Sequence, residues 1–313
     1  MKRILCITPL LKEIEYILFQ IDKTAIYEPT ITKSKLISLL KRNVDITHIF
    51  CNPNEQNYML DEEVLKNFHD KIINTCSTGT NHIDKEYCKN NNITIWSLTK
   101  DYELIKNLPS TAEVAFGLML DLLKNITKTQ SFVKHGIWDS KRFMNRQIEG
   151  LTVGIVGYGR LGHFFEKFAR GFGMNVIVYD PYKIYYNGYQ CNTLEELIKL
   201  SDVITLHVHV TDETRYMINI QSLSSSMKNP IVINTSRGEI VNENDIIDAF
   251  EAGFISGYGA DVIEDEFKDD WYDVSQIINN MNKHNIIVTP HIGGGSKEGT
   301  LRAFKWAMDK FKN

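Results

Sequence analysis

Gly157-Tyr158-Gly159-Arg160-Leu161-Gly162 decides the fold, because an apolar run at residues 151–156 precedes it and an amphipathic helix pattern follows it. Such a turn passes through left-handed backbone conformations and lets a pyrophosphate approach, so glycine is needed where a Cβ atom would collide. The helix that follows points its unpaired N–H groups at the anion. Its apolar residues have the spacing that packs a helix on a sheet: Leu161, Phe164, Phe165, Phe168, Ala169 and Phe172. The context predicts a dinucleotide-binding site.

Asp180 indicates which dinucleotide binds. It follows a second apolar run, at 174–179, where an acidic side chain can accept hydrogen bonds from both hydroxyl groups of an adenosine ribose. A carboxylate at this place would repel the 2′-phosphate of NADP. We therefore expect NAD as the cofactor.

Length and charge narrow the class of protein. The 313 residues exceed the range in which a single core keeps growing, so two domains are expected. The 35 basic and 39 acidic residues give a net charge of −4 and form no basic block. This balance argues against nucleic acid and anionic membranes as partners and favours a small dissolved ligand. No stretch of sequence approaches the apolar length of a membrane span, and Lys12, Glu13 and Glu15 interrupt any signal-peptide core.

The cysteines and histidines indicate neither a disulfide framework nor a metal centre. The five cysteines form no C-x-x-C pair, which suits a reducing cytoplasm and small buried side chains: Cys6, Cys51, Cys76, Cys88 and Cys191. His207 and His209 would share one face of a strand, but no third ligand stands near them. We expect a cytoplasmic protein without a bound metal.

Short apolar runs alternate with helical patterns along the chain. The predicted strands lie at 3–8, 24–27, 47–51, 71–75 and 93–97, and then at 151–156, 175–179, 203–207, 231–234, 256–260 and 286–289. This alternation predicts an α/β protein with two doubly wound parallel sheets. The last helical pattern, at 297–310, brings no sheet of its own and is expected to cross back to the first domain. We predict a Rossmann NAD-binding domain, residues 106–290, inserted in a flavodoxin-like substrate-binding domain, residues 1–105 completed by 291–313.

A helical pattern at 111–123 is apolar on nearly every side. Such a helix must be buried all round. It could lie in a seam between domains, against a second subunit, or in an ordinary core. The pattern alone does not choose among the three.

Arg237, Glu266 and His291 follow three of the later predicted strands, at the edge where ligands bind in open α/β sheets. Hydride transfer to a 2-keto acid requires a fixed cation for the carboxylate and a proton donor for the oxygen that becomes a hydroxyl group. The planar fork of arginine provides the cation. Histidine titrates near neutral pH, and a neighbouring carboxylate can orient its ring. Taken singly, each has a simpler interpretation: a surface arginine at a turn, one acid in an acidic run, and a histidine that ends a strand.

Several motifs in one order resemble the D-isomer-specific 2-hydroxyacid dehydrogenase family. This family includes phosphoglycerate dehydrogenase, hydroxypyruvate and glyoxylate reductases, D-lactate dehydrogenase and formate dehydrogenase. The similarity covers nearly the whole chain and is densest between residues 75 and 291. The matching segments are 77–84, Ala112-Glu113, Gly136-x-Trp138, 157–162, Leu206-His207, Thr211-x-x-Thr214, 234–238, Asp261 and Pro290-His291.

The resemblance implies a role for each matching residue. Arg237 would bind the carboxylate and keto oxygen, His291 would be the acid and base, and Glu266 would be its partner. The implied cofactor contacts are the turn of Gly157, Gly159 and Gly162, the N–H groups of Arg160 and Leu161, Asp180 at the ribose, Asp261 at the carboxamide, and Thr78, Val208, Thr235, Ser236 and Gly294 elsewhere along NAD. The implied substrate cradle is the backbone of Ser77, Thr78 and Gly79. Closure of two domains would then exclude water from the hydride.

The chain departs from the family pattern at three places. His209 stands where many members have proline. Phe267 follows Glu266 where proline is usual, which leaves open whether Glu264 or Glu266 partners the histidine. The loop at 51–55 contains no arginine to meet a phosphate, which weakens phosphoglycerate as the substrate.

We therefore predict an NAD-dependent oxidoreductase that interconverts a small D-2-hydroxy acid and its 2-keto acid, of the 3-phosphoglycerate, hydroxypyruvate or glyoxylate class. We expect a homodimer joined through the helix at 111–123. The alternative is an NAD(H)-sensing protein similar to the transcriptional corepressors on the same scaffold. The sequence selects neither the acid nor the direction of the reaction.

Overall fold

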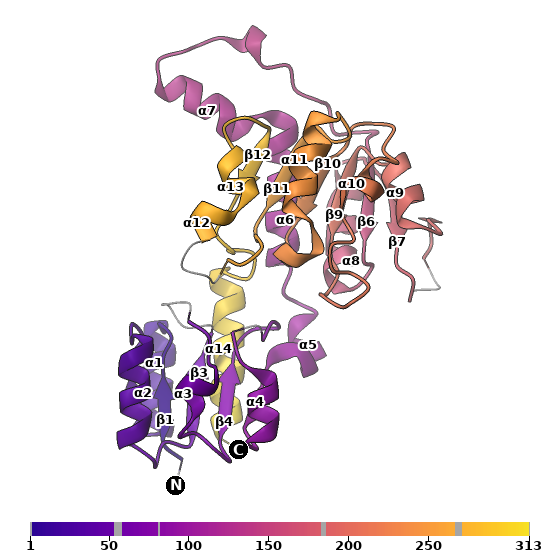
Figure 1. Cartoon of the computed structure of the whole chain (residues 1–313). Helices are drawn as coiled ribbons and strands as arrows, with labels where there is room; N and C mark the ends of the chain where they lie inside the picture. Colours follow the sequence, from indigo (N-terminus) through magenta and orange to yellow (C-terminus); the bar gives the residue numbers. More distant parts are fainter. Residues whose placement is uncertain (1, 53–57, 81, 183–185, 267–270, 313) are drawn as a thin grey trace. The chain divides into compact units, whose positions relative to one another are not determined.

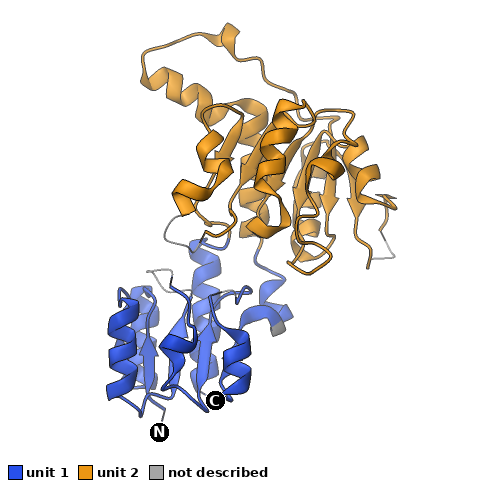
Figure 2. Cartoon of the chain, in the orientation of Figure 1, with its two compact units in different colours: residues 1–108, 294–313 blue, residues 109–293 orange. Residues whose placement is uncertain are grey.

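The chain forms two compact units (Figure 2). The computed structural model describes residues 2–52, 58–80, 82–182, 186–266 and 271–312. Unit 1 comprises Met1–Leu108 and Gly294–Asn313, and unit 2 comprises Pro109–Gly293. Each unit is built on a parallel β-sheet with helices between most successive strands (Figure 1).

The sheet of unit 1 has the strand order β2-β1-β3-β4-β5, and every pairing is parallel. Its elements are β1 (Ile4–Cys6), α1 (Lys12–Ile21), β2 (Ile26–Tyr27), α2 (Lys33–Arg42), β3 (His48–Cys51), α3 (Glu62–Leu65), β4 (Ile72–Thr75), α4 (Lys85–Asn90), β5 (Thr94–Trp96), the short 3-10 helix η1 (Leu98–Lys100), α5 (Tyr102–Ile105) and α14 (Lys297–Lys312). The chain winds from the centre of the sheet first to one edge and then to the other. This is the flavodoxin-like order.

The C-terminal helix α14 packs in the core of unit 1, together with β1 and β3. Its buried residues form one stripe along the helix: Ala303, Phe304, Ala307, Met308 and Phe311. The rings of Phe304 and Phe311 both meet Phe50 of β3 edge to face, an arrangement that aromatic rings favour. Both ends of the chain therefore contribute to one core.

The sheet of unit 2 has the order β12-β11-β10-β9-β6-β7-β8, again with parallel pairings throughout. Its elements are α6 (Ser110–Lys124), α7 (Ile126–Lys134), η2 (Ser140–Arg142), β6 (Thr152–Val156), α8 (Arg160–Gly171), β7 (Asn175–Tyr179), β8 (Tyr189–Gln190), α9 (Leu194–Leu200), β9 (Val203–Leu206), α10 (Ile220–Leu223), β10 (Ile231–Asn234), η3 (Gly238–Ile240), α11 (Glu243–Glu251), β11 (Gly257–Ala260), α12 (Trp271–Val274), α13 (Gln276–Asn280) and β12 (Ile286–Val288). The winding reverses between β6 and β9. In doubly wound sheets, ligands bind beyond the carboxyl ends of the strands at such a reversal.

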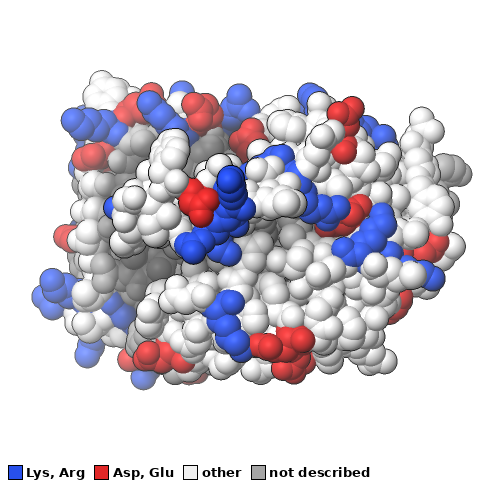
Figure 3. Space-filling model, turned by 90° about the horizontal axis from the view of Figure 1, so that it is seen from above, with Lys and Arg blue, Asp and Glu red and all other residues white. Residues whose placement is uncertain are grey.

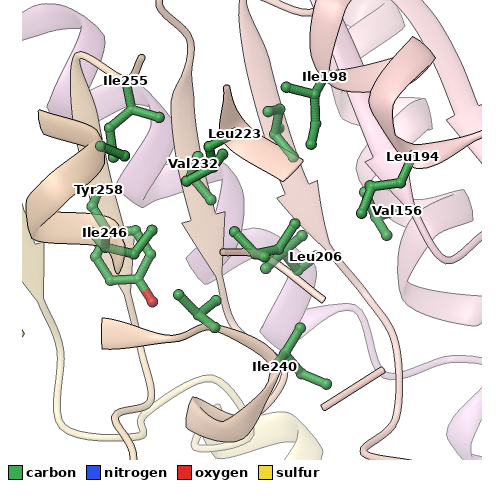
Figure 4. Packing of buried hydrophobic residues seen from close by; sticks show 14 of the residues in the cluster. Val156, Leu194, Ile198, Leu206, Leu223, Val232, Ile240, Ile246, Ile255 and Tyr258 are labelled. Carbon is green, nitrogen blue, oxygen red and sulfur yellow. The ribbon is translucent and has the colours of Figure 1, made fainter. Parts of the chain in front are cut away.

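Helices cover both faces of the unit 2 sheet. Helices α9, α10, α11 and α13 pack on one face, where Figure 4 shows Val232 and Tyr258 of the strands among Leu223 and Ile246 of the helices. Helices α6 and α8 pack on the other face. Strands buried on both sides carry continuous apolar runs. That is why the sequence indicates their positions.

Helix α6 lies in the core of unit 2, against α8, β10 and β11. Its buried residues are Ala112, Ala115, Phe116, Leu118, Met119, Leu122 and Leu123. The ring of Phe116 contacts those of Phe165 and Phe168 on α8. Packing inside unit 2 therefore accounts for the apolar surface of the predicted helix at 111–123.

The predicted fold class is confirmed, since both sheets are parallel and wound on both sides. Strand β8 was not predicted, because Tyr189 and Gln190 form no apolar run. No helix in the described ranges is long and apolar enough to cross a lipid bilayer.

Candidate active site

The glycine turn follows β6 and requires glycine at two of its positions. Gly157 has a φ of 86°, and a Cβ atom there would lie 2.6 Å from the carbonyl oxygen of His207. A Cβ atom on Gly162 would lie 2.5 Å from the carbonyl oxygen of Gly157. These contacts pack β6, the turn and α8 tightly, as a dinucleotide turn requires.

Gly159 needs a different explanation, because a Cβ atom there would meet no atom within 4 Å. It is the N-cap of α8, and its φ of −84° suits any residue. Arg160 and Leu161 are the first residues of that helix. Open space beside Gly159 thus adjoins a helix N-terminus, where backbone N–H groups favour an anion. The turn fits a pyrophosphate.

Asp180 lies just beyond β7 and is held against the glycine turn. Its carboxylate accepts a hydrogen bond from the backbone N–H of Tyr158 at 2.9 Å and another from that of Tyr182 at 3.0 Å. Carboxylate oxygens have further lone pairs. The side chain is therefore fixed at the turn and still able to accept ribose hydroxyl groups.

The loops after β9 and β10 complete this edge of unit 2. Val208 lies over the turn, with its Cγ1 atom 2.7 Å from where a Cβ atom of Gly157 would stand. The hydroxyl group of Ser236 donates to the carbonyl oxygen of Leu206 at 2.7 Å. The hydroxyl group of Thr235 is buried and has no hydrogen-bond partner among the described residues. A buried polar group without a partner is costly, so a ligand that bonds to Thr235 would relieve that cost.

Arg237, Glu266 and His291 lie beyond three neighbouring strands. β10, β11 and β12 are adjacent and parallel, so their carboxyl ends share one edge of the sheet. Arg237 is the N-cap of η3, immediately after β10. It is half-buried, and its Nη1 donates to the carbonyl oxygen of Ser236 at 2.6 Å. Guanidinium carries five N–H donors, so this contact leaves others for a ligand.

Glu266 contacts His291. The Oε1 atom of Glu266 lies 2.8 Å from Nδ1 of His291, and the two side chains are 16% and 39% exposed. Glu264, the other acid left open by the sequence, accepts a hydrogen bond from the hydroxyl group of Tyr216. A carboxylate at Nδ1 sets the tautomer of an imidazole and orients its ring. The partner of the histidine in this structure is therefore Glu266.

Asp261 holds the loop that carries His291. It is 1% exposed, and its Oδ1 accepts the N–H of Ile292 at 2.9 Å and the hydroxyl group of Thr289 at 2.5 Å. Its Oδ2 accepts the N–H of Gly293 at 2.7 Å. The backbone of His291 adopts the left-handed region, with a φ of 53°. Asp261 thus shapes the loop. Its contact with the carboxamide of NAD stays a prediction.

The predicted substrate cradle belongs to unit 1. Ser77, Thr78 and Gly79 follow β4, and their conformation is fixed by a bond from Ser77 Oγ to the carbonyl oxygen of Gly79 and by one from Thr99 Oγ1 to that of Thr78 at 3.0 Å. Gly294 begins the second segment of unit 1. The other residues predicted for cofactor binding and catalysis all lie in unit 2, whereas these four belong to unit 1.

The remaining predictions concern the cysteines, a metal site and the three departures from the family pattern. All five cysteines are free and buried, and burial raises the pKa of the Cys191 thiol to about 12. Within the described ranges no group of three or more histidine, cysteine or acidic side chains could hold a metal ion. His209 is exposed. Phe267 and the loop positions 53–55 lie outside the described residues.

Tyr216 and Glu243 were not predicted as site residues, and both contact the segment that leads to Glu266. Tyr216 has a φ of 53°, which is unusual for a tyrosine. No local pattern shows this conformation. The only signal for Glu243 is its place at the first turn of a predicted helix, where acids are common for other reasons.

Comparisons with known proteins identify the family of the chain. Residues 116–293 match the family model described as the D-isomer specific 2-hydroxyacid dehydrogenase, NAD binding domain. A glyoxylate reductase of Thermococcus litoralis is 34% identical over 76% of this chain and 72% of its own length. A hydroxypyruvate reductase of Thermotoga maritima is 32% identical over 74% of this chain and 73% of its own.

A solved structure shows the same fold over the whole chain. It is the D-lactate dehydrogenase of Aquifex aeolicus complexed with NAD and lactic acid, with a TM-score of 0.75, 26% identity, and coverage of 99% of this chain and 94% of that one. The glycine turn, Asp180 and the unpartnered Thr235 hydroxyl group fit the same cofactor. The chain belongs to the D-isomer specific 2-hydroxyacid dehydrogenases and is an NAD-dependent oxidoreductase.

Proposed function

We propose that this enzyme interconverts a small D-2-hydroxy acid and its 2-keto acid, with Arg237, Glu266 and His291 as its catalytic residues. The contact between Glu266 and His291, beside the loop that carries Arg237, supports this proposal most strongly. An imidazole oriented by a carboxylate can donate a proton to a carbonyl oxygen and take it back in the reverse reaction. A guanidinium group can bind a carboxylate through two parallel hydrogen bonds.

In the direction of reduction, bound NADH supplies a hydride to the carbonyl carbon. His291 donates a proton from Nε2 to the carbonyl oxygen, and Glu266 accepts the Nδ1 hydrogen bond and stabilises the charged ring before transfer. Arg237 binds the substrate carboxylate and orients the carbonyl group between donor and acid. Oxidation of the hydroxy acid is the reverse, with His291 taking the hydroxyl proton.

The geometry of unit 2 supports a set of proposed cofactor contacts. We propose that the pyrophosphate binds at Gly157, Gly159 and Gly162 and that Asp180 accepts the ribose hydroxyl groups. Val208, Thr235, Ser236 and Asp261 would bind farther along NAD. The roles of Ser77, Thr78, Gly79 and Gly294, and the division into substrate-binding and NAD-binding domains at residues 105 and 290, remain predictions.

The substrate class is glyoxylate, hydroxypyruvate or 3-phosphohydroxypyruvate. Two relatives are a glyoxylate reductase and a hydroxypyruvate reductase, and the absence of arginine at 51–55 counts against the phosphorylated acid. The test is NADH oxidation with these three acids and pyruvate. We expect turnover with at least one unphosphorylated acid. Silence across the panel despite saturable NADH binding would favour an NAD(H)-sensing protein instead.

We propose a homodimer, and the segment that follows α6 supports it. Helix α7 contains no buried residue, and Figure 1 shows it and the following chain extending from the rest of unit 2. The exposed apolar residues of this segment are Ile126, Val133, Ile137, Trp138 and Met144. Exposed apolar side chains gathered in one segment indicate an interface. Light scattering should give twice the chain mass, and Trp138→Lys should weaken the dimer.

A small dissolved ligand remains the expected partner. On the face shown in Figure 3, basic and acidic side chains are interspersed. On that face, the mixture of charges forms no uniformly basic footprint for a phosphate backbone. The five free thiols agree with the predicted cytoplasmic location.

A further inference from the structure

Glu243 is a buried acid whose carboxylate joins two separate segments of unit 2. It is the first residue of α11 and is 8% exposed. Its Oε1 accepts the backbone N–H of Glu264 at 3.0 Å. Its Oε2 accepts the hydroxyl group of Ser275 at 2.7 Å and the N–H of Ile277 at 3.4 Å. The carboxylate thus ties the segment before Glu266 to the start of α13.

The same segment is held from a second side. A Cβ atom on Gly238 would lie 2.2 Å from the backbone nitrogen of Glu264 and 2.2 Å from the carbonyl carbon of Ile263. Gly238 immediately follows Arg237, so the loop that carries the arginine lies directly against the segment that leads to Glu266. Asp265 has a φ of 59°, a strained conformation for a residue other than glycine. Such a turn persists only where its surroundings restrain it.

We propose that Glu243 is a positioning residue that holds the backbone at Glu264, so that Glu266 reaches Nδ1 of His291. The inference rests on the proposed function of that pair. Glu243 acts through Glu266 and is not itself a catalytic residue. All three groups that it contacts are hydrogen-bond donors. A carboxylate accepts from all of them, and the N-terminal turn of a helix favours its charge.

Glu243→Gln is the sharpest variant, because it keeps the shape and replaces one acceptor oxygen with an amide donor. The hydroxyl group of Ser275 can also accept, so the new amide can donate to it. The one remaining oxygen cannot accept both the N–H of Glu264 and that of Ile277, so one of these backbone contacts is lost. We expect kcat to fall about tenfold, the loss that corresponds to one hydrogen bond to a charged group. The KM for the keto acid and the Kd for NADH should stay within about twofold.

Ser275→Ala provides the matched control. It removes one contact on the Oε2 side and leaves the bond from the N–H of Glu264 intact. Its thermal stability should fall as that of Glu243→Gln does, while its kcat stays within about twofold of the unaltered enzyme. If the two variants lose kcat equally, Glu243 is only structural.

A double variant tests whether Glu243 acts through Glu266. If it does, adding Glu243→Gln to Glu266→Gln lowers kcat by less than about twofold further, since the positioned group is already gone. Multiplicative losses would overturn the proposal. If Glu266→Gln alone has full activity, the proposed function fails and not this inference. Should Glu243→Gln not fold, Glu243→Asp, which keeps the charge one methylene shorter, must show the same non-additivity.

Discussion

We expect alanine substitutions at Gly162 and Gly159, two glycines of the same turn, to affect stability differently. Gly162→Ala would place a Cβ atom 2.5 Å from the carbonyl oxygen of Gly157, where ordinary contacts begin near 3.4 Å. The backbone must therefore shift, and overpacking of this kind costs about 1–3 kcal/mol of unfolding free energy. Gly159→Ala meets no atom within 4 Å at a φ of −84°. Alanine is a poorer helix cap than glycine, but it also makes the unfolded chain stiffer. These two effects should nearly cancel, so the unfolding free energy should change by less than about 0.5 kcal/mol.

The two alanine variants should also differ in their affinity for NADH. The Cβ atom of Gly159→Ala would enter the space proposed for the pyrophosphate, so the Kd for NADH should rise at least about tenfold while the melting temperature holds. Gly162→Ala should lower both affinity and melting temperature. Thermal unfolding and titration of NADH fluorescence measure the two properties on the same samples. Unchanged NADH affinity in Gly159→Ala would refute the assignment of this turn to the dinucleotide.

Three more predictions concern charged and titrating side chains. Arg237→Lys should lower kcat and raise the KM for the keto acid, because an ammonium group cannot make two parallel bonds to a carboxylate; steady-state kinetics would contradict this if only one parameter changed. Asp180→Ser should narrow the preference for NADH over NADPH, measured as a ratio of kcat/KM values, because the repulsive carboxylate is gone. Burial lowers the pKa of His48 from 6.5 to about 4. Unfolding then takes up a proton below pH 6.5, so His48 should lower the unfolding free energy by about 2 kcal/mol between pH 7 and pH 5. Urea titrations of His48→Phe should lack this part of the pH dependence, and an unchanged difference between pH 7 and pH 5 would contradict it.

Most of the fold could be predicted, because local patterns carry it. Parallel strands buried on both faces appear as apolar runs, and the turn after β6 needs glycine for reasons visible in the sequence. Strand β8 could not be predicted, since Tyr189 and Gln190 form no apolar run, unlike the two residues of β2. The surroundings of α6 were also undetermined, because an apolar helix shows that it is buried and not what buries it.

The sequence indicates candidate residues for the site, but it does not indicate which of them contact one another. Glu264 and Glu266 are equivalent in an acidic run, and the left-handed turn at Asp265 between them directs one to Tyr216 and the other to His291. Glu243 is separated from Glu264 along the chain by the rest of α11 and by β11. Contacts of this kind depend on how separate loops meet in three dimensions. Sequence patterns of period two or 3.6 carry no information about them.

The proposed reaction requires His291 to donate a proton to the carbonyl oxygen of the keto acid. A single variant, His291→Gln, tests it most directly, with turnover of the best keto acid measured at saturating NADH. We expect kcat to fall at least about a hundredfold, the usual contribution of a general acid, while the Kd for NADH stays within about twofold. A kcat close to that of the unaltered enzyme would contradict the claim.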